Sequence, residues 1–294
     1  MNNLSGFSRK ADFHTHSVFC DGKNTCEEML IAALDCGLEA LGFSGHAMWP
    51  FAGDCHIAIN SFDSYVEEIK RLKSLYKNKI QLFCGYEAEY LPYASQPDLS
   101  VYKSQLAADY IIGSVHYLAP SPNLPPFAVD WKPEIIADCA EKCFGGNYRR
   151  LVEFYFETVR QMIKYSTFDF AGHLDLIRKL NGKLHFFSED EGWYKEEIIK
   201  TARCCGDARI MAEINTGAIS RGVMDDVYPG AEFLTELCRC NVPIVINSDA
   251  HSAAGIACAF DRAQIAAKNA GYTGSMQLFW QEDKPVWQFV PFVQ

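Results

Sequence analysis

Two pairs of ligand-type side chains, each separated by one residue, occur near opposite ends of the sequence. His14 and His16 follow a short apolar run. Asp249 and His251 follow the apolar run Val242–Ile246 in the same alternating arrangement. Alternate residues of an extended segment point to the same side, so each pair can direct two donors at one metal ion. Either pair could instead be structural, the second one by capping a helix.

Other ligand types follow other short apolar runs along the chain. They are His46, Glu87, His116, His173 and Asn215, and Asp21 follows His16 by five residues in a Cys-Asp-Gly turn. In a barrel of parallel strands, the carboxyl ends of all strands meet on one face, where such enzymes place their chemistry. Residues spread over the whole sequence would therefore converge into one cluster.

Short β-rich runs that alternate with helical patterns predict repeated βα units, an α/β fold with a parallel sheet. The predicted strands are Ala11–His14, Ala40–Ser44, Ile80–Gly85, Tyr110–Ser114, Phe168–Gly172, Met211–Asn215 and Pro243–Asn247. The predicted helices are Cys26–Cys36, Ser64–Tyr76, Tyr148–Tyr165, Glu189–Cys205, Ala231–Cys240 and Ile256–Asn269. With no internal repeat or low-complexity tract, we expect residues 1–294 to form a single domain.

Two local features refine this outline. Ser64 and Glu67 have the spacing of a capping box at the start of a helix. The segment Ala119–Lys132 contains four prolines and is predicted to be a long loop without regular secondary structure. Because it follows the strand that ends near His116, it would overhang the proposed site.

Composition excludes several classes of protein. Of the 294 residues, 49% are hydrophobic and 22% are charged, which is typical of a globular chain with a large core. A net charge of −10 argues against binding of long nucleic acids. We find neither a signal peptide nor an apolar stretch long enough for a membrane span, so a cytoplasmic protein is expected. The twelve cysteines lack zinc-knuckle spacing and are expected to be reduced, mostly in the core.

In order and spacing, the ligand-type motifs resemble the polymerase and histidinol phosphatase (PHP) family, and within it the histidinol-phosphatase branch. The matches lie between residues 11 and 251. They are His14-Thr15-His16, Cys20-Asp21-Gly22, Gly42-Phe43-Ser44-Gly45-His46, Gly85-Tyr86-Glu87, Gly113-Ser114-Val115-His116, Gly172-His173-Leu174-Asp175-Leu176, Asn215-Thr216-Gly217 and Ser248-Asp249-Ala250-His251.

The resemblance implies a distorted (β/α)7 TIM-like barrel that holds two to three divalent ions. It assigns His14, His16, Glu87 and Asp249 to the first ion, Asp21, His46 and His251 to the second, and His116 and His173 to the third, with Glu87 bridging. Many relatives carry His where this chain has Asp21. Mixed nitrogen and oxygen ligands suit zinc, manganese or iron, and the sequence does not choose among them.

Such a cluster predicts phosphoester hydrolysis, because two nearby divalent ions can activate water and hold both the attacking and the leaving oxygen. Asp249 and His251 are the predicted catalytic residues, with Asp249 as proton donor to the leaving group, unless a metal-bound water fills that role. The resemblance also implies that Arg178 and Arg221 contact the phosphate. A surface position remained the alternative for both.

The leading hypothesis is hydrolysis of L-histidinol phosphate to L-histidinol and phosphate in histidine biosynthesis. Glu89, Asp54 and Glu213 are the candidates to bind the substrate's amine and imidazole, and Glu89 is the one we predict. An alternative is a phosphoesterase of broader scope, acting on nucleotides or other small phosphate esters. A third possibility is a metal-binding domain without activity. The oligomeric state is left open.

Overall fold

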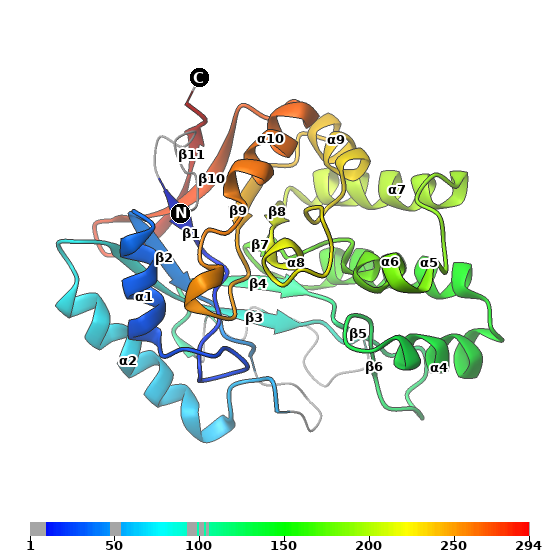
Figure 1. Cartoon of the computed structure of the whole chain (residues 1–294), viewed down its shortest axis with the longest axis horizontal. Coiled ribbons are helices and arrows are strands. Elements are labelled where there is room, and N and C mark those ends of the chain that lie inside the picture. Colours follow the sequence, from blue (N-terminus) through cyan, green and yellow to red (C-terminus); the bar gives the residue numbers. More distant parts are fainter. Residues whose placement is uncertain (1–9, 48–53, 93–98, 100–102, 104–105, 294) are drawn as a thin grey trace.

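The computed structural model describes residues 10–47, 54–92, 99, 103 and 106–293. Seven strands form one sheet in which every neighbouring pair is parallel (Figure 1). In sheet order they are β1 (Ala11–Asp12), β2 (Ala40–Phe43), β3 (Gln81–Glu89), β4 (Tyr110–Ser114), β7 (Phe170–Ala171), β8 (Met211–Asn215) and β9 (Ile244–Asn247). The predicted parallel α/β fold is confirmed.

The sheet curls until its two edge strands meet. One parallel bridge, Thr15 to Ala250, joins the segment after β1 to the segment after β9. In it the His16 amide donates to the Ala250 carbonyl at 2.9 Å, and the Ala250 amide donates to the His14 carbonyl at 3.2 Å. This narrow contact nearly closes a seven-stranded barrel, and it brings the two ligand pairs of the sequence side by side.

Helices surround the barrel, and the longer ones cover its outside (Figure 1). They are α1 (Cys26–Asp35), α2 (Phe62–Leu75), α4 (Pro133–Phe144), α5 (Tyr148–Tyr165), α6 (Asn181–Leu184), α7 (Gly192–Ala208), α8 (Gly217–Ser220), α9 (Ala231–Arg239) and α10 (Phe260–Ala270), with short 3-10 turns η1 (Ile59–Ser61), η2 (Leu176–Leu180) and η3 (Ala253–Gly255). Helix α5 shows the packing rule: Leu151, Tyr155, Val159 and Met162 recur at helical spacing and are buried. No helix within these ranges is long and apolar enough to span a bilayer.

Two local predictions were wrong. Ser64 and Glu67 form no capping box, because α2 already begins at Phe62, directly after η1. The capping box lies instead at α1, where the Glu28 amide donates to the Thr25 hydroxyl at 3.2 Å and the Thr25 amide donates to the Glu28 carboxylate at 2.8 Å.

The proline-rich segment is also more regular than predicted. Strands β5 (Tyr117–Leu118) and β6 (Phe127–Ala128) pair antiparallel within it, so its two ends are held together. Helix α4, which the sequence did not predict, then begins directly after the segment with Pro133 in its first turn, where a missing amide costs no hydrogen bond.

A C-terminal hairpin, β10 (Gly274–Gln281) and β11 (Lys284–Pro291), packs at the amino ends of the barrel strands and was likewise not predicted. The indole of Trp280 donates to the Leu82 carbonyl at 3.1 Å, and that of Trp287 donates to Asp169 at 3.2 Å. Inside the barrel, the Tyr110 ring lies so close to Gly85 that a Cβ there would collide with it. The interior is therefore a packed core, and the chemistry is left to the carboxyl face.

Candidate metal centre

Glu87, at the carboxyl end of β3, lies at the centre of the predicted ligands and is buried. Its Oε2 lies 3.1 Å from His14 Nε2, 3.4 Å from His16 Nε2 and 3.2 Å from His46 Nδ1. Its Oε1 lies 2.8 Å from His173 Nε2 and 3.4 Å from His116 Nε2. One carboxylate thus faces two sets of histidines, one with each oxygen.

A second group lies around Asp21, in the turn after His16. Asp21 Oδ2 is 3.3 Å from His251 Nε2 and 3.7 Å from His46 Nε2, and Asp21 Oδ1 is 3.5 Å from His16 Nδ1. The His16 and His251 rings stack with their centroids 4.0 Å apart. Residues from opposite ends of the chain therefore meet here because the barrel closes between them.

Asp249 completes the centre from the end of β9. Its Oδ1 lies 3.6 Å from His14 Nε2 and 3.4 Å from His16 Nε2. Its backbone adopts a left-handed conformation, with φ of 50°, which Asp tolerates better than most residues. The preceding Ser248 holds this bend, because both its amide and its hydroxyl donate to the buried carboxylate of Asp12.

Three sets of donor atoms are each close enough to share one ion. They are His16, Asp21, His46 and His251; His14, His16 and Asp249; and His46, Glu87 and His116. These sets overlap the three assigned from the resemblance but are not identical to them. His16 and His46 each occur in two sets, and His173 belongs to none, although its Nε2 contacts Glu87.

The donors fit a divalent metal. The Nε2 atoms of His14 and His16 are buried and make no hydrogen bond to any described residue, although both lie beside carboxylate oxygens. Buried polar atoms in this state usually have a partner, and an ion between nitrogen and oxygen donors supplies one. Burial alone would lower the pKa of His116, but the negative charges of Glu87 and Glu89 outweigh this effect and raise the pKa to about 10. The carboxylates thus stabilise positive charge at this position.

Carboxylates behind the histidines orient the rings. Glu213, in β8, accepts from His14 Nδ1 at 2.7 Å and from the His173 amide at 3.0 Å. Glu89 accepts from His116 Nδ1 at 2.8 Å and from the Tyr117 amide at 2.9 Å. These contacts favour an orienting role for Glu213 and Glu89 over the amine-binding role considered from sequence. The third candidate for that role, Asp54, is exposed.

The two arginines occupy different surroundings. Arg221 donates through Nη1 to the Asp249 carbonyl at 2.9 Å and through Nη2 to Asp249 Oδ2 at 3.0 Å, with 29% of its side chain exposed. Gly217 permits this approach, because a Cβ there would lie 2.7 Å from both Arg221 Nη2 and Asp249 Oδ2. Burial raises the pKa of Asp249, but Arg221 and His14 hold it well below its usual range. An ionised Asp249 suits a ligand, and its role as proton donor stays a prediction.

Arg178 is buried among acidic side chains. It donates through Nε to Glu189 at 2.8 Å, through Nη2 to Asp226 at 2.8 Å and through Nη1 to Asp175 at 3.4 Å. These contacts tie η2 to the segments before α7 and before α9. A phosphate bound by Arg178, as predicted from the sequence, would have to compete with these three carboxylates for the guanidinium donors.

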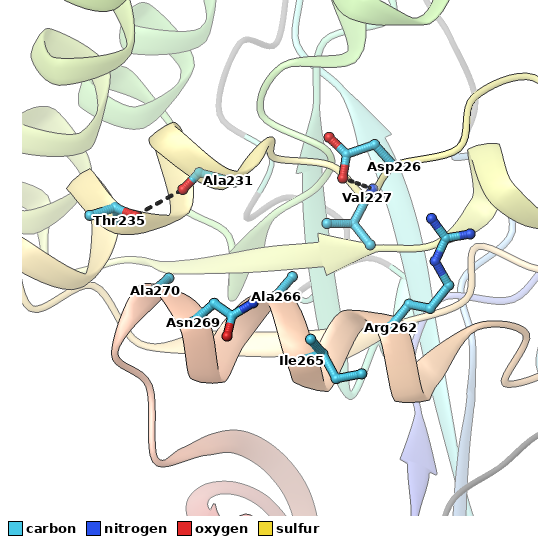
Figure 2. Close-up of a pocket in the computed structure, with 9 residues that line it drawn as sticks. All are labelled: Asp226, Val227, Ala231, Thr235, Arg262, Ile265, Ala266, Asn269 and Ala270. Atoms are coloured by element: carbon cyan, nitrogen blue, oxygen red, sulfur yellow. Dashed lines mark hydrogen bonds between the residues drawn. The ribbon is translucent and has the colours of Figure 1, made fainter.

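Figure 2 shows a pocket of about 400 Å³ between α9 and α10. Its apolar lining residues are Val227, Ala231 from α9, and Ile265, Ala266 and Ala270 from α10. The predicted metal ligands, Arg178 and Arg221 are all absent from its lining, so this pocket is separate from the candidate metal centre.

The chain is similar to proteins of known family. Residues 12–217 match the family model of the PHP domain. A probable histidinol-phosphatase of Deinococcus radiodurans is 27% identical over 243 residues, which cover 82% of this chain and 85% of that protein. A histidinol-phosphatase of Bacillus subtilis is 24% identical, with 86% of this chain and 97% of that protein covered.

Two solved structures have the same fold. Histidinol phosphate phosphatase of Lactococcus lactis, solved with zinc, L-histidinol and phosphate, superposes with a TM-score of 0.71 at 19% identity, covering 95% of this chain and 99% of that one. A putative histidinol phosphatase of Listeria monocytogenes also gives 0.71, at 22% identity, with coverage of 84% and 97%. The TIM-like barrel predicted from the sequence is therefore confirmed.

Proposed function

Because this chain belongs to the PHP domain family, we propose that it is a metal-dependent phosphomonoesterase that hydrolyses L-histidinol phosphate to L-histidinol and phosphate. The observation that carries the reaction type is the convergence of five histidines on the single carboxylate of Glu87. The substrate rests on the relatives, which cover most of the chain and bear the name histidinol-phosphatase.

We propose two or three divalent ions, of zinc, manganese or iron. Zinc is present in the Lactococcus lactis relative. The ligands would be the nine residues named above, with Glu87 shared between sites. When bound, such ions supply an activated water molecule and positive charge at the phosphate oxygens.

The chain's own groups prepare this site. Glu213 and Glu89 fix the rings of His14 and His116 and leave their Nε2 atoms to face Glu87. Buried partners of this kind raise the basicity of a ligand and fix its direction. Arg221, partly exposed beside Asp249, would donate hydrogen bonds to the phosphate oxygens through its planar guanidinium group.

A broader phosphoesterase is the second candidate. Metal ligands and Arg221 recognise only the phosphate that every monoester shares, so they do not by themselves select the alcohol. A non-catalytic domain is the third. The deciding experiment measures bound metal after purification without added metal, and then phosphate release from L-histidinol phosphate, an aryl phosphate and a nucleoside monophosphate.

We expect release that a chelator abolishes, with kcat/KM highest for L-histidinol phosphate. Equal kcat/KM on the three esters would favour the broader phosphoesterase. No release with zinc, manganese or iron would favour the non-catalytic domain. Asp138→Asn, which changes an exposed Asp paired with Lys142 on α4, serves as the matched control for handling and folding.

A further inference from the structure

Asp130 is an acidic residue near the metal ligands that the sequence did not single out. It follows β6, and β6 pairs with β5, the strand that comes directly after His116. The amide of Val129 donates to the His116 carbonyl at 2.8 Å. Asp130, the next residue, is therefore held beside a predicted metal ligand by the backbone of its own loop.

An ion pair fixes the side chain of Asp130. Lys179 Nζ donates to Asp130 Oδ2 at 2.7 Å, and the two side chains are 17% and 22% exposed. Lys179 lies in η2, shortly after His173. The pair thus connects the loop that follows His116 to the loop that follows His173. Among the described residues, only Lys179 donates to the Asp130 carboxylate, so Oδ1 remains available to a ligand.

The charge of Asp130 interacts with residues of the candidate metal centre. Burial raises the pKa of Asp130, but Lys179, His116 and His173 lower it below its usual value. In the other direction, Asp130 contributes to the raised pKa of Arg221, behind the larger contribution of Asp249. The ionised Asp130 carboxylate therefore interacts electrostatically with Arg221, the predicted phosphate-binding residue, and with the predicted metal ligands His116 and His173.

Other nearby carboxylates are already engaged. Glu89 and Glu213 each accept hydrogen bonds from a predicted metal-binding histidine and from backbone amides. Asp21 and Asp249 face the histidines directly. Asp130 differs from these four because the one side chain that donates to its carboxylate is Lys179, a cation at the edge of the site, and not a predicted metal-binding histidine.

We infer that Asp130 binds the ammonium group of the substrate and that Lys179 positions Asp130 for it. This inference rests on the proposed function. In L-histidinol phosphate the amine is carried by the carbon next to the phosphorylated CH2 group, so the ammonium must lie close to any site that holds the phosphate. Asp130, beside His116 and within reach of Arg221, has the charge and the place to receive it. Phosphate esters without this amine would lose that contact, which gives selectivity beyond the shared phosphate.

The test compares L-histidinol phosphate with imidazolylpropyl phosphate, which lacks only the amine. In the wild type, kcat/KM should favour the amine-bearing ester. In Asp130→Asn that ratio should fall by roughly 10- to 100-fold, the range for losing a hydrogen bond between charged groups. Metal content should equal that of the wild type. A ratio equal to that of the wild type, whether or not kcat/KM falls by the same factor on both esters, would overturn the inference. Asp130 would then serve only to hold its loop through the ion pair with Lys179.

Lys179 provides a second measurement. Lys179→Met should reduce the same ratio, mainly through a higher KM for the amine-bearing ester, and Lys179→Arg should restore part of it because a cation again holds Asp130. A purely structural pair would change kcat/KM for both esters equally. Asp138→Asn is again the matched control. If wild-type protein releases phosphate but does not prefer the amine-bearing ester, the proposed substrate fails before Asp130 is tested.

Discussion

His14 and Glu213 form a buried hydrogen bond of 2.7 Å between His14 Nδ1 and Glu213 Oε1, and neither side chain is exposed to solvent. The bond fixes the ring so that its other nitrogen, Nε2, lies 3.1 Å from Glu87. His14 follows the end of β1, and Glu213 lies in β8. A carboxylate in this position turns a histidine into a directed ligand.

Glu213→Gln is expected to weaken metal binding or activity by roughly 10- to 100-fold, because loss of an orienting partner costs that much at comparable metal sites. Titration of the metal-free protein with zinc, followed by phosphate release, measures both. Glu157→Gln, which alters an exposed ion pair with Arg150 on α5, is the matched control. Zinc affinity equal to that of the wild type would contradict the orienting role.

His251→Ala and Asp249→Asn are each expected to remove nearly all phosphatase activity while the barrel stays folded, because both side chains contact the predicted ligands and neither belongs to the apolar core. Circular dichroism and metal content, measured with phosphate release, separate loss of the site from loss of the fold. His185→Asn, at the left-handed end of α6, is a control away from the cluster. Turnover close to the wild-type rate in either variant would remove these residues from the mechanism.

Arg221→Ala should reduce kcat/KM by roughly 10²–10³, the usual cost of losing one preorganised charge contact to the reacting group. Bound metal should not change, since Arg221 contacts Asp249 through its own donors and is not itself a ligand. Arg262→Ala, which removes a surface arginine paired with Asp225, provides the comparison. Unchanged kinetics would mean that Arg221 only braces Asp249.

Arg178→Ala is expected to destabilise the fold by about 3–5 kcal/mol, the cost of breaking a buried ion pair and leaving its partner uncompensated. The Arg178 and Asp175 side chains are 6% and 1% exposed, so solvent cannot replace the contact. Urea unfolding monitored by fluorescence gives the free energy directly. A large loss of kcat/KM with unchanged stability would instead support the predicted contact between Arg178 and the phosphate.

Glu89→Gln should lower kcat/KM by the same factor for L-histidinol phosphate and for an aryl phosphate, because Glu89 acts on His116 and through it on the reaction common to both. Parallel assays on the two esters decide this. A loss confined to L-histidinol phosphate would restore the role in amine binding predicted from the sequence.

The positions of the predicted metal ligands were accessible from the sequence. Apart from Asp21, which lies in a turn after His16, the candidates follow short apolar runs, and parallel strands must end on one face, so convergence required no knowledge of packing. The runs Tyr110–Ser114 and Met211–Asn215 coincide with β4 and β8. The same reasoning missed α4, although Pro133 in its first turn and the left-handed Gly145 at its end are local helix signals. It also missed the β10–β11 hairpin, whose strands pair with each other and not with the barrel sheet.

What holds the candidate ligands in place was decided only by the tertiary structure. Glu213 and Glu89 looked like free acidic groups in the sequence, and Asp130 lay in a segment read as an irregular loop. Their partners are 199, 27 and 49 residues away along the chain. A carboxylate's role depends on which donor lies within about 3 Å of its oxygens. Barrel closure and loop pairing set those neighbours, and no local sequence pattern records them.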